Sequence, residues 1–123
     1  MSYKHLKHSC QAIVVACMDF RLQKIIHEWA VKNIKGQFDM LTLAGGVKDL
    51  NFVLGQIELS VKLHHTKEVY LINHEDCGAY GKTGNYKKHQ NDLKYAKSKI
   101  AEKFPKLKIY LFYLKLDGKF VKV

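Results

Sequence analysis

Apolar residues follow two different spacings near the start of the chain, and these predict a strand and then a helix. The run 12–16 is continuous, apolar and rich in β-branched residues, which is typical of a strand buried on both faces. Apolar residues then recur in the i, i+3, i+4, i+7, i+8 pattern of an amphipathic helix, from Leu22 to Ala30. Gly36 ends this first unit.

The same alternation continues to the end of the chain. Residue spacing predicts a strand over 38–43, a helix from Leu50 to about His64 and a strand over 68–73. A further helix is marked by Leu93, Ala96, Ile100 and Phe104, and it stops at Pro105. A strand over 109–115, a turn at Asp117-Gly118 and a short strand over 120–123 follow.

This order predicts an α/β fold with a central, mostly parallel sheet of four strands, helices on both faces and a C-terminal antiparallel edge hairpin. The chain has 123 residues and no linker or repeat, so we expect a single domain over 1–123. Ligands of such sheets bind at the carboxyl ends of the strands. Cys17, Gly45-Gly46 and His74 each follow a predicted strand, so the pattern places them at one edge of the sheet.

Composition narrows the classes of partner and compartment. The net charge of +10 suggests nucleic acid, but the lysines are spread over every segment and no aromatic-basic strip occurs, so we expect a solvated surface and no nucleic-acid partner. No apolar stretch approaches the roughly 18 residues of a membrane span, and the N-terminus lacks the apolar part of a signal peptide. A cytoplasmic protein with no membrane partner is expected.

The cysteines and histidines divide into candidates for metal binding or catalysis and residues that are interpreted as structural or exposed. Three cysteines are an odd number for a disulfide scaffold, and in a reducing compartment a pair distant in sequence indicates metal binding or catalysis. Cys10 is interpreted as a small apolar residue just before the first strand. His27, His64 and His65 are interpreted as surface histidines, although any of them can carry protons.

Cys17, His74 and Cys77 are the predicted metal ligands. His74 and Cys77 are three residues apart and can chelate one ion from a single turn, while Cys17 closes the site from the end of the first predicted strand. Two thiolates and an imidazole favour Zn²⁺, and three protein ligands leave one position open for water or substrate.

Asp19 has two alternative roles. It can be a fourth zinc ligand, which gives a closed structural site, or it can accept a hydrogen bond from water at the metal. Arg21 is the only arginine among 21 lysines and arginines, and a guanidinium paired to both carboxylate oxygens would keep Asp19 ionised and away from the metal. Ala44-Gly45-Gly46 can bring backbone N–H groups close to a substrate oxygen.

Together, Cys-x-Asp-x-Arg at 17–21, Ala-Gly-Gly at 44–46 and His-x-x-Cys-Gly at 74–78 resemble the β-class carbonic anhydrases. The resemblance covers roughly residues 10–123. It implies zinc-dependent, reversible hydration of CO2 to bicarbonate by a zinc-bound hydroxide, with Cys17, His74 and Cys77 as ligands. Asp19 and Arg21 would be the catalytic pair, and Gly45 and Gly46 would line the substrate pocket.

The resemblance also implies a homodimer or a higher homo-oligomer. Only 16 residues precede Cys17, so this is expected to be a minimal member without the N-terminal helical arm of many relatives. Two alternatives remain open. One is a related zinc hydrolase acting on carbonyl sulfide or carbon disulfide, and the other is a non-catalytic zinc-binding or bicarbonate-sensing module with a closed site.

Overall fold

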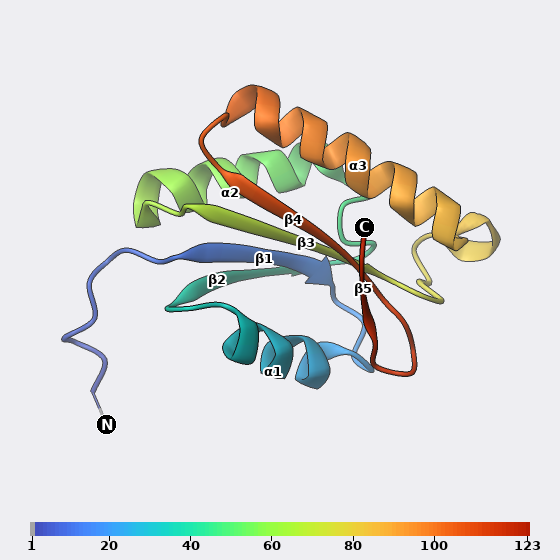
Figure 1. Ribbon diagram of the computed structural model, residues 1–123, viewed down its shortest axis with the longest axis horizontal. Helices are drawn as coiled ribbons and strands as arrows, with labels where there is room; N and C mark the ends of the chain where they lie inside the picture. Colours follow the sequence, from blue (N-terminus) through green and yellow to red (C-terminus); the bar gives the residue numbers. More distant parts are fainter. Residues whose placement is uncertain (1) are drawn as a thin grey trace.

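The protein forms a five-stranded sheet with helices on both faces, as seen in a computed structural model that describes residues 2–123 (Figure 1). The elements follow one another as β1 (Ala12–Cys17), α1 (Gln23–Asn33), β2 (Phe38–Leu43), α2 (Leu50–His64), β3 (Glu68–His74), a 3₁₀ turn η1 (Gly81–Thr83), α3 (Tyr86–Lys103), β4 (Lys108–Leu114) and β5 (Phe120–Lys122).

The strand order is β2-β1-β3-β4-β5. The first four strands are parallel, and β5 pairs antiparallel with β4 through residue pairs such as Leu114 and Phe120. This confirms the predicted α/β class, the parallel central sheet and the antiparallel edge hairpin. Among residues 2–123, no helix is both long and apolar enough to cross a membrane.

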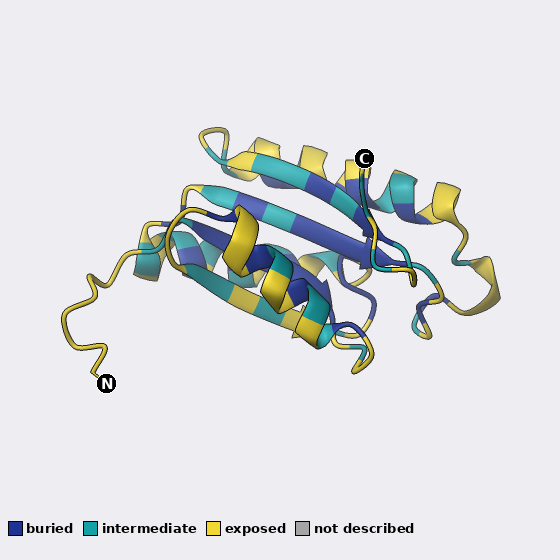
Figure 2. Cartoon of the chain, turned by 60° about the horizontal axis from the view of Figure 1, so that its bottom comes forward, coloured by how far each residue is buried: buried dark blue, intermediate teal, exposed yellow. Residues whose placement is uncertain are grey.

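Two apolar layers hold the helices to the sheet. Helices α2 and α3 cover one face through residues such as Val53, Ile57 and Leu93, whereas α1 covers the other face through Ile26 and Ala30. All six residues of β1 are buried, which explains the continuous apolar run, and exposed residues lie on the outer sides of the helices (Figure 2).

The sheet geometry places the ends of β1, β2 and β3 side by side. Cys17 pairs in register with Leu43, and Ala16 pairs with Ile72, so the residues that follow these strands meet at one edge. The predicted convergence of the Cys17, Gly45-Gly46 and His74 segments therefore occurs.

Candidate metal centre

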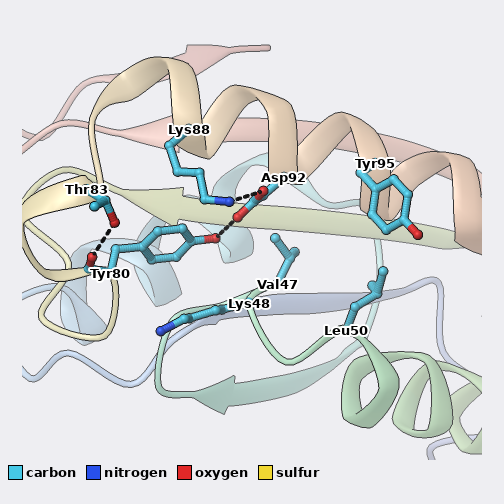
Figure 3. A pocket seen from close by; sticks show the side chains of 8 residues that line it. All are labelled: Val47, Lys48, Leu50, Tyr80, Thr83, Lys88, Asp92 and Tyr95. Carbon is cyan, nitrogen blue, oxygen red and sulfur yellow. Dashed lines mark hydrogen bonds and ion pairs between the residues drawn. The ribbon is translucent and has the colours of Figure 1, made fainter.

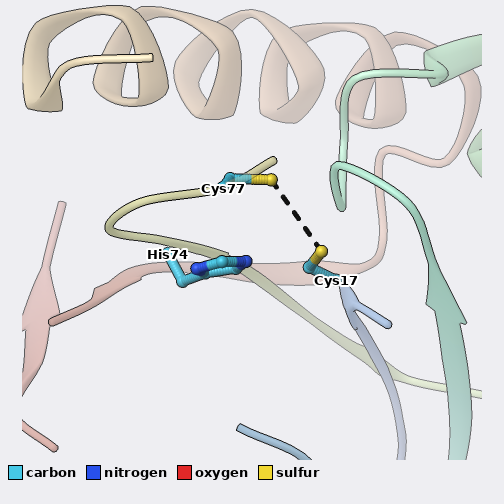
Figure 4. Close-up of side chains that lie close together, drawn as sticks. All are labelled: Cys17, His74 and Cys77. Atoms are coloured by element: carbon cyan, nitrogen blue, oxygen red, sulfur yellow. Dashed lines mark hydrogen bonds between the residues drawn. The ribbon is translucent and has the colours of Figure 1, made fainter. Parts of the chain in front are cut away.

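Cys17, His74 and Cys77 meet at the carboxyl ends of β1 and β3 (Figure 4). One ligand atom from each residue lies within 4.8 Å of the other two, and the two Sγ atoms are 3.8 Å apart. All three side chains are buried. The three residues predicted as metal ligands thus form one compact donor set of two sulfurs and one nitrogen.

The ring of His74 is oriented for metal binding. Its Nδ1 donates to the backbone carbonyl of Glu75 at 2.6 Å, because a carbonyl can only accept. This fixes the tautomer and leaves the lone pair on Nε2, which is buried and has no hydrogen-bond partner among the described residues. A buried acceptor without a partner is costly, and an imidazole held by a carbonyl at its other nitrogen is typical of metal ligands. The site therefore fits a metal ion.

The surroundings of the two thiols also fit a cation. Burial raises the pKa of Cys77, and the neighbouring Cys17 adds to this effect, while the backbone N–H groups of Ala79 and Tyr80 act in the opposite direction. The backbone N–H of Gly45 donates to Sγ of Cys17 at 3.4 Å. A bound cation would favour both thiolates, and the backbone donors are already directed at them.

Arg21 holds Asp19 through both carboxylate oxygens. Its Nε lies 3.1 Å from Oδ1 and its Nη2 lies 2.7 Å from Oδ2, while its backbone N–H donates to Oδ1 at 2.9 Å. These hydrogen bonds lower the pKa of Asp19 to about 2. Oδ2 of Asp19 is 3.8 Å from Nε2 of His74, so the carboxylate stands beside the donor set and is ionised at neutral pH.

Two further residues, Asp76 and Gln23, support this arrangement. Asp76 accepts from Arg21 at its carboxylate (3.2 Å) and at its backbone carbonyl (3.0 Å), which fixes the guanidinium from the far side. The side-chain amide of Gln23 donates to the carbonyls of Cys17 and Asp19 at 2.9 and 2.8 Å. Gln23 thereby ties the start of α1 to Cys17 at the end of β1 and to the loop that follows it.

An open cavity of about 740 Å³ borders the donor set. It is lined by Cys17, Met18, Asp19, Phe20, Arg21, Ala44, Asp76, Gly78 and Ala79. From the segment that follows β2, the residue that lines the cavity is Ala44. The backbone N–H of Gly45 is engaged with Cys17 and that of Gly46 with the carbonyl of Leu43, so their contact with substrate stays a prediction.

Asn73 connects the loop after β2 to a buried polar network. Its Oδ1 accepts from the backbone N–H of Val47 at 3.2 Å, and its Nδ2 lies 3.1 Å from the hydroxyl of Tyr80 and 2.9 Å from Nδ1 of His89. The Tyr80 hydroxyl in turn donates to Asp92 at 2.8 Å. Burial, followed by the hydrogen bond to Asp92 and then its charge, raises the pKa of Tyr80.

A second cavity, of about 290 Å³, is lined in part by Tyr80 (Figure 3). Lys48 and Lys88 line it, and Lys88 pairs with Asp92 at 3.2 Å. Tyr80 lines this cavity and also packs in one cluster with Cys17 and Cys77 of the candidate metal centre. Nothing in the sequence marks Tyr80 except its place three residues after Cys77.

A family model described as "Putative carbonic anhydrase" matches residues 7–123. The chain belongs to this carbonic anhydrase family. A curated relative, an uncharacterized protein of Rickettsia bellii, is 29% identical over 143 residues, which cover 96% of this chain and 85% of the relative.

Solved β-carbonic anhydrases share the fold. The carbonic anhydrase of Streptococcus mutans aligns with a TM-score of 0.71 at 20% identity, covering 99% of this chain and 87% of that one. A tetrameric β-carbonic anhydrase of Sordaria macrospora aligns at 0.57 and 13% identity (95% and 82% covered). A carbon disulfide hydrolase in its apo form aligns at 0.56 and 15% identity (91% and 77% covered). The family model thus confirms the predicted carbonic anhydrase family, and the solved structures show that the chain has the fold of β-class enzymes.

Proposed function

We propose that this carbonic anhydrase family member catalyses the reversible hydration of CO2 to bicarbonate at a zinc ion held by Cys17, His74 and Cys77. The observation that carries the proposal is the hold of Arg21 on both oxygens of Asp19. A carboxylate engaged in this way is kept off the metal, which leaves three protein ligands and an open position, as in catalytic zinc sites.

The chemistry divides between the metal and the chain. Cys17, His74 and Cys77 would hold the zinc ion, which when bound would supply Lewis acidity and make water a nucleophile near neutral pH. Asp19 can accept a hydrogen bond from that water, because its lowered pKa keeps the carboxylate ionised. Arg21 orients Asp19, and the open cavity beside Ala44 and Gly78 gives a small substrate access. Two thiolates leave less positive charge on zinc than neutral ligands would. Water at the metal would therefore lose its proton less readily, so activity should rise towards alkaline pH.

Further parts of the proposal follow from the same family. We infer that residues 1–123 act as a single zinc domain, that the protein is cytoplasmic, and that it assembles at least as a homodimer, which the tetrameric relative supports. We also propose that Gly45 and Gly46 line the substrate pocket. No nucleic-acid partner is expected.

A second candidate function is hydrolysis of carbonyl sulfide or carbon disulfide. The structural likeness to a carbon disulfide hydrolase favours it as the alternative. A third candidate is a closed, non-catalytic zinc module, in which Asp19 would leave Arg21 and bind the metal. The short gap of 3.8 Å between Oδ2 of Asp19 and Nε2 of His74 makes this geometry accessible.

The test is CO2 hydration by protein of measured zinc content between about pH 6.5 and 9. The proposal predicts activity that scales with zinc content and rises with pH. Sulfide release from carbon disulfide without CO2 hydration would favour the second candidate. Absence of both activities in fully zinc-loaded protein would favour the closed module.

A further inference from the structure

A second group of metal-ligating side chains lies at the opposite end of the sheet from the candidate metal centre. Cys10 precedes β1, Asp39 is the second residue of β2, and His64 is the last residue of α2. One ligand atom from each lies within 4.8 Å of the other two. From this end, β1 extends about 16 Å to Cys17 at a rise of roughly 3.3 Å per residue, so the two groups are separate.

The contacts of these residues hold the group together. Nδ1 of His64 lies 2.7 and 2.9 Å from the two oxygens of Asp39, and the hydroxyl of Ser60 donates to Asp39 at 2.7 Å. The backbone N–H of Cys10 donates to the carbonyl of His64 at 2.8 Å. Segments distant in sequence are thus fixed side by side before any ion binds.

The thiol of Cys10 has polar surroundings. Its Sγ lies 3.3 Å from the hydroxyl of Thr66 and 3.4 Å from the carbonyl of Ala12. No hydrogen bond joins it to His64 among residues 2–123, so the geometry is not that of a cysteine activated by a histidine. The interpretation of Cys10 as a small apolar residue does not account for these contacts.

His8 adds a fourth donor. Its ring meets that of His64 edge-on, with the centroids 4.6 Å apart, and its side chain is exposed. The side chains of His64 and Asp39 are also 30% and 29% exposed, so an ion can reach the group from solvent. The thiol of Cys10, the carboxylate of Asp39 and the imidazole of His64 thus lie together near the surface, and the ring of His8 packs against that of His64.

We propose that Cys10, Asp39, His64 and His8 form a second site for a divalent transition-metal ion of the zinc class. Ligands bound at about 2.0–2.3 Å around one tetrahedral ion lie roughly 3.3–3.8 Å apart, so the present separations of Cys10, Asp39 and His64 require only small side-chain movements, and His8 would turn towards them from its contact with His64. The ion would take the place of the hydrogen bond between Nδ1 of His64 and the carboxylate of Asp39. Because His8 and Cys10 precede β1, binding would tie the N-terminal segment to the ends of α2 and β2.

The test is the number of Zn²⁺ ions bound per chain, counted by native mass spectrometry. Wild-type protein should bind two. Cys10→Ser with His64→Asn should bind one, and Cys17→Ser with Cys77→Ser should also bind one. His27→Asn removes an exposed histidine of α1 and should leave two. Two ions bound by the Cys10/His64 variant, or none bound by the Cys17/Cys77 variant, would overturn the proposal.

A measurement on the wild-type chain avoids any folding defect of these variants. Zn²⁺ added beyond the first equivalent should slow alkylation of Cys10 several-fold, as located by peptide mapping, and a chelator should restore the rate. In His8→Ala, which removes an exposed side chain, more Zn²⁺ should be needed by about tenfold or more. An alkylation rate of Cys10 that does not respond to Zn²⁺ would contradict the site. Neither result depends on CO2 hydration.

Discussion

In the proposed function, Arg21 determines whether the metal site is open or closed, because it holds Asp19. A guanidinium offers several N–H donors in a rigid plane, and here they reach Asp19 through Nε and Nη2 and Asp76 through Nη1 and Nη2. A lysine would supply the same charge but could not hold both oxygens of one carboxylate in a fixed plane. In a chain whose other basic residues are lysines, the one arginine stands where this geometry is needed.

Replacing Arg21 by lysine should lower CO2 hydration by roughly tenfold to a hundredfold with zinc content unchanged. The freed carboxylate of Asp19 can then approach the metal and close the open position. Kinetics on zinc-quantified protein checks this. Asp76→Asn is the matched control, because it leaves the hold on Asp19 in place and should cost much less. Wild-type activity in Arg21→Lys would show that catalysis does not require Arg21 to hold Asp19.

His89 should make stability depend on pH. Its side chain is buried, and burial followed by the nearby His74 lowers the pKa of His89 to about 4. Between its ordinary pKa of about 6.5 and that value, the unfolded chain takes up a proton that the folded chain does not, so stability falls as pH is lowered.

The expected loss from His89 is at most about 1.4 kcal/mol for each pH unit over that window. Urea unfolding of the wild type and of His89→Gln at several pH values measures it, because the variant lacks this proton. The difference between the two free energies of unfolding should change with pH below about 6.5 and level off below about 4. A difference that is constant over this window would contradict a neutral, buried His89.

At the scale of elements, the apolar spacing predicted every strand and the three α-helices, because burial on one or both faces leaves a periodic pattern in sequence. It did not predict the start of α3. Residues 86–92 are mostly polar, and among them only His89 is buried, so there is no apolar stripe to detect. The sequence feature that marks the start of α3 is Asn85, whose side chain caps the helix by accepting from the N–H of Lys88 at 2.8 Å.

The convergence of Cys17, His74 and Cys77 could be predicted because a strand end fixes where the next residue lies. The supporting residues could not, since their roles depend on contacts between segments far apart in sequence. Asn73, for example, lies one residue before His74 in a buried strand, and only the folded chain shows that its side chain holds the loop after β2. Gln23 is a further case, because only the fold brings its amide to the carbonyls of Cys17 and Asp19.

The loop after β2 should not tolerate a side chain at Gly46. Its φ is +59°, and a Cβ there would overlap Oδ1 of Asn73 and lie 3.2 Å from the carbonyl of Ile72. Gly46→Ala should therefore destabilise the protein by about 1–3 kcal/mol, as measured by urea unfolding.

Gly55→Ala is the matched control. Gly55 lies inside α2 with open space around its Cα, so alanine should stabilise the helix by roughly 0.5–1 kcal/mol. A neutral Gly46→Ala would show that Asn73 does not restrain the loop.

At the scale of the whole molecule, the rim of the candidate metal centre is unusually apolar for a surface. Phe20 is 88% exposed and Met18 is 60% exposed, and both line the cavity. Large apolar side chains gathered beside a functional site commonly mark an interface. The predicted homo-oligomer would cover them and close one side of the cavity.

Phe20→Ser should shift the protein towards monomer, because it removes the most exposed of the large apolar side chains at this rim. Sedimentation equilibrium of both proteins at matched concentration measures the change. Tyr95→Ser removes another exposed aromatic side chain (58%) on α3 and should leave the mass unchanged. Equal masses for the wild type and Phe20→Ser would place the interface elsewhere.

In the proposed function, Asp19 is held by Arg21 and acts beside an open zinc site. The decisive measurement compares CO2 hydration by wild-type and Asp19→Asn protein at equal, measured zinc content. We expect clear activity in the wild type and a loss of about a hundredfold or more in the variant, with zinc retained. Equal activity in the two proteins would contradict the role of Asp19, and an inactive, fully zinc-loaded wild type would contradict an open catalytic site.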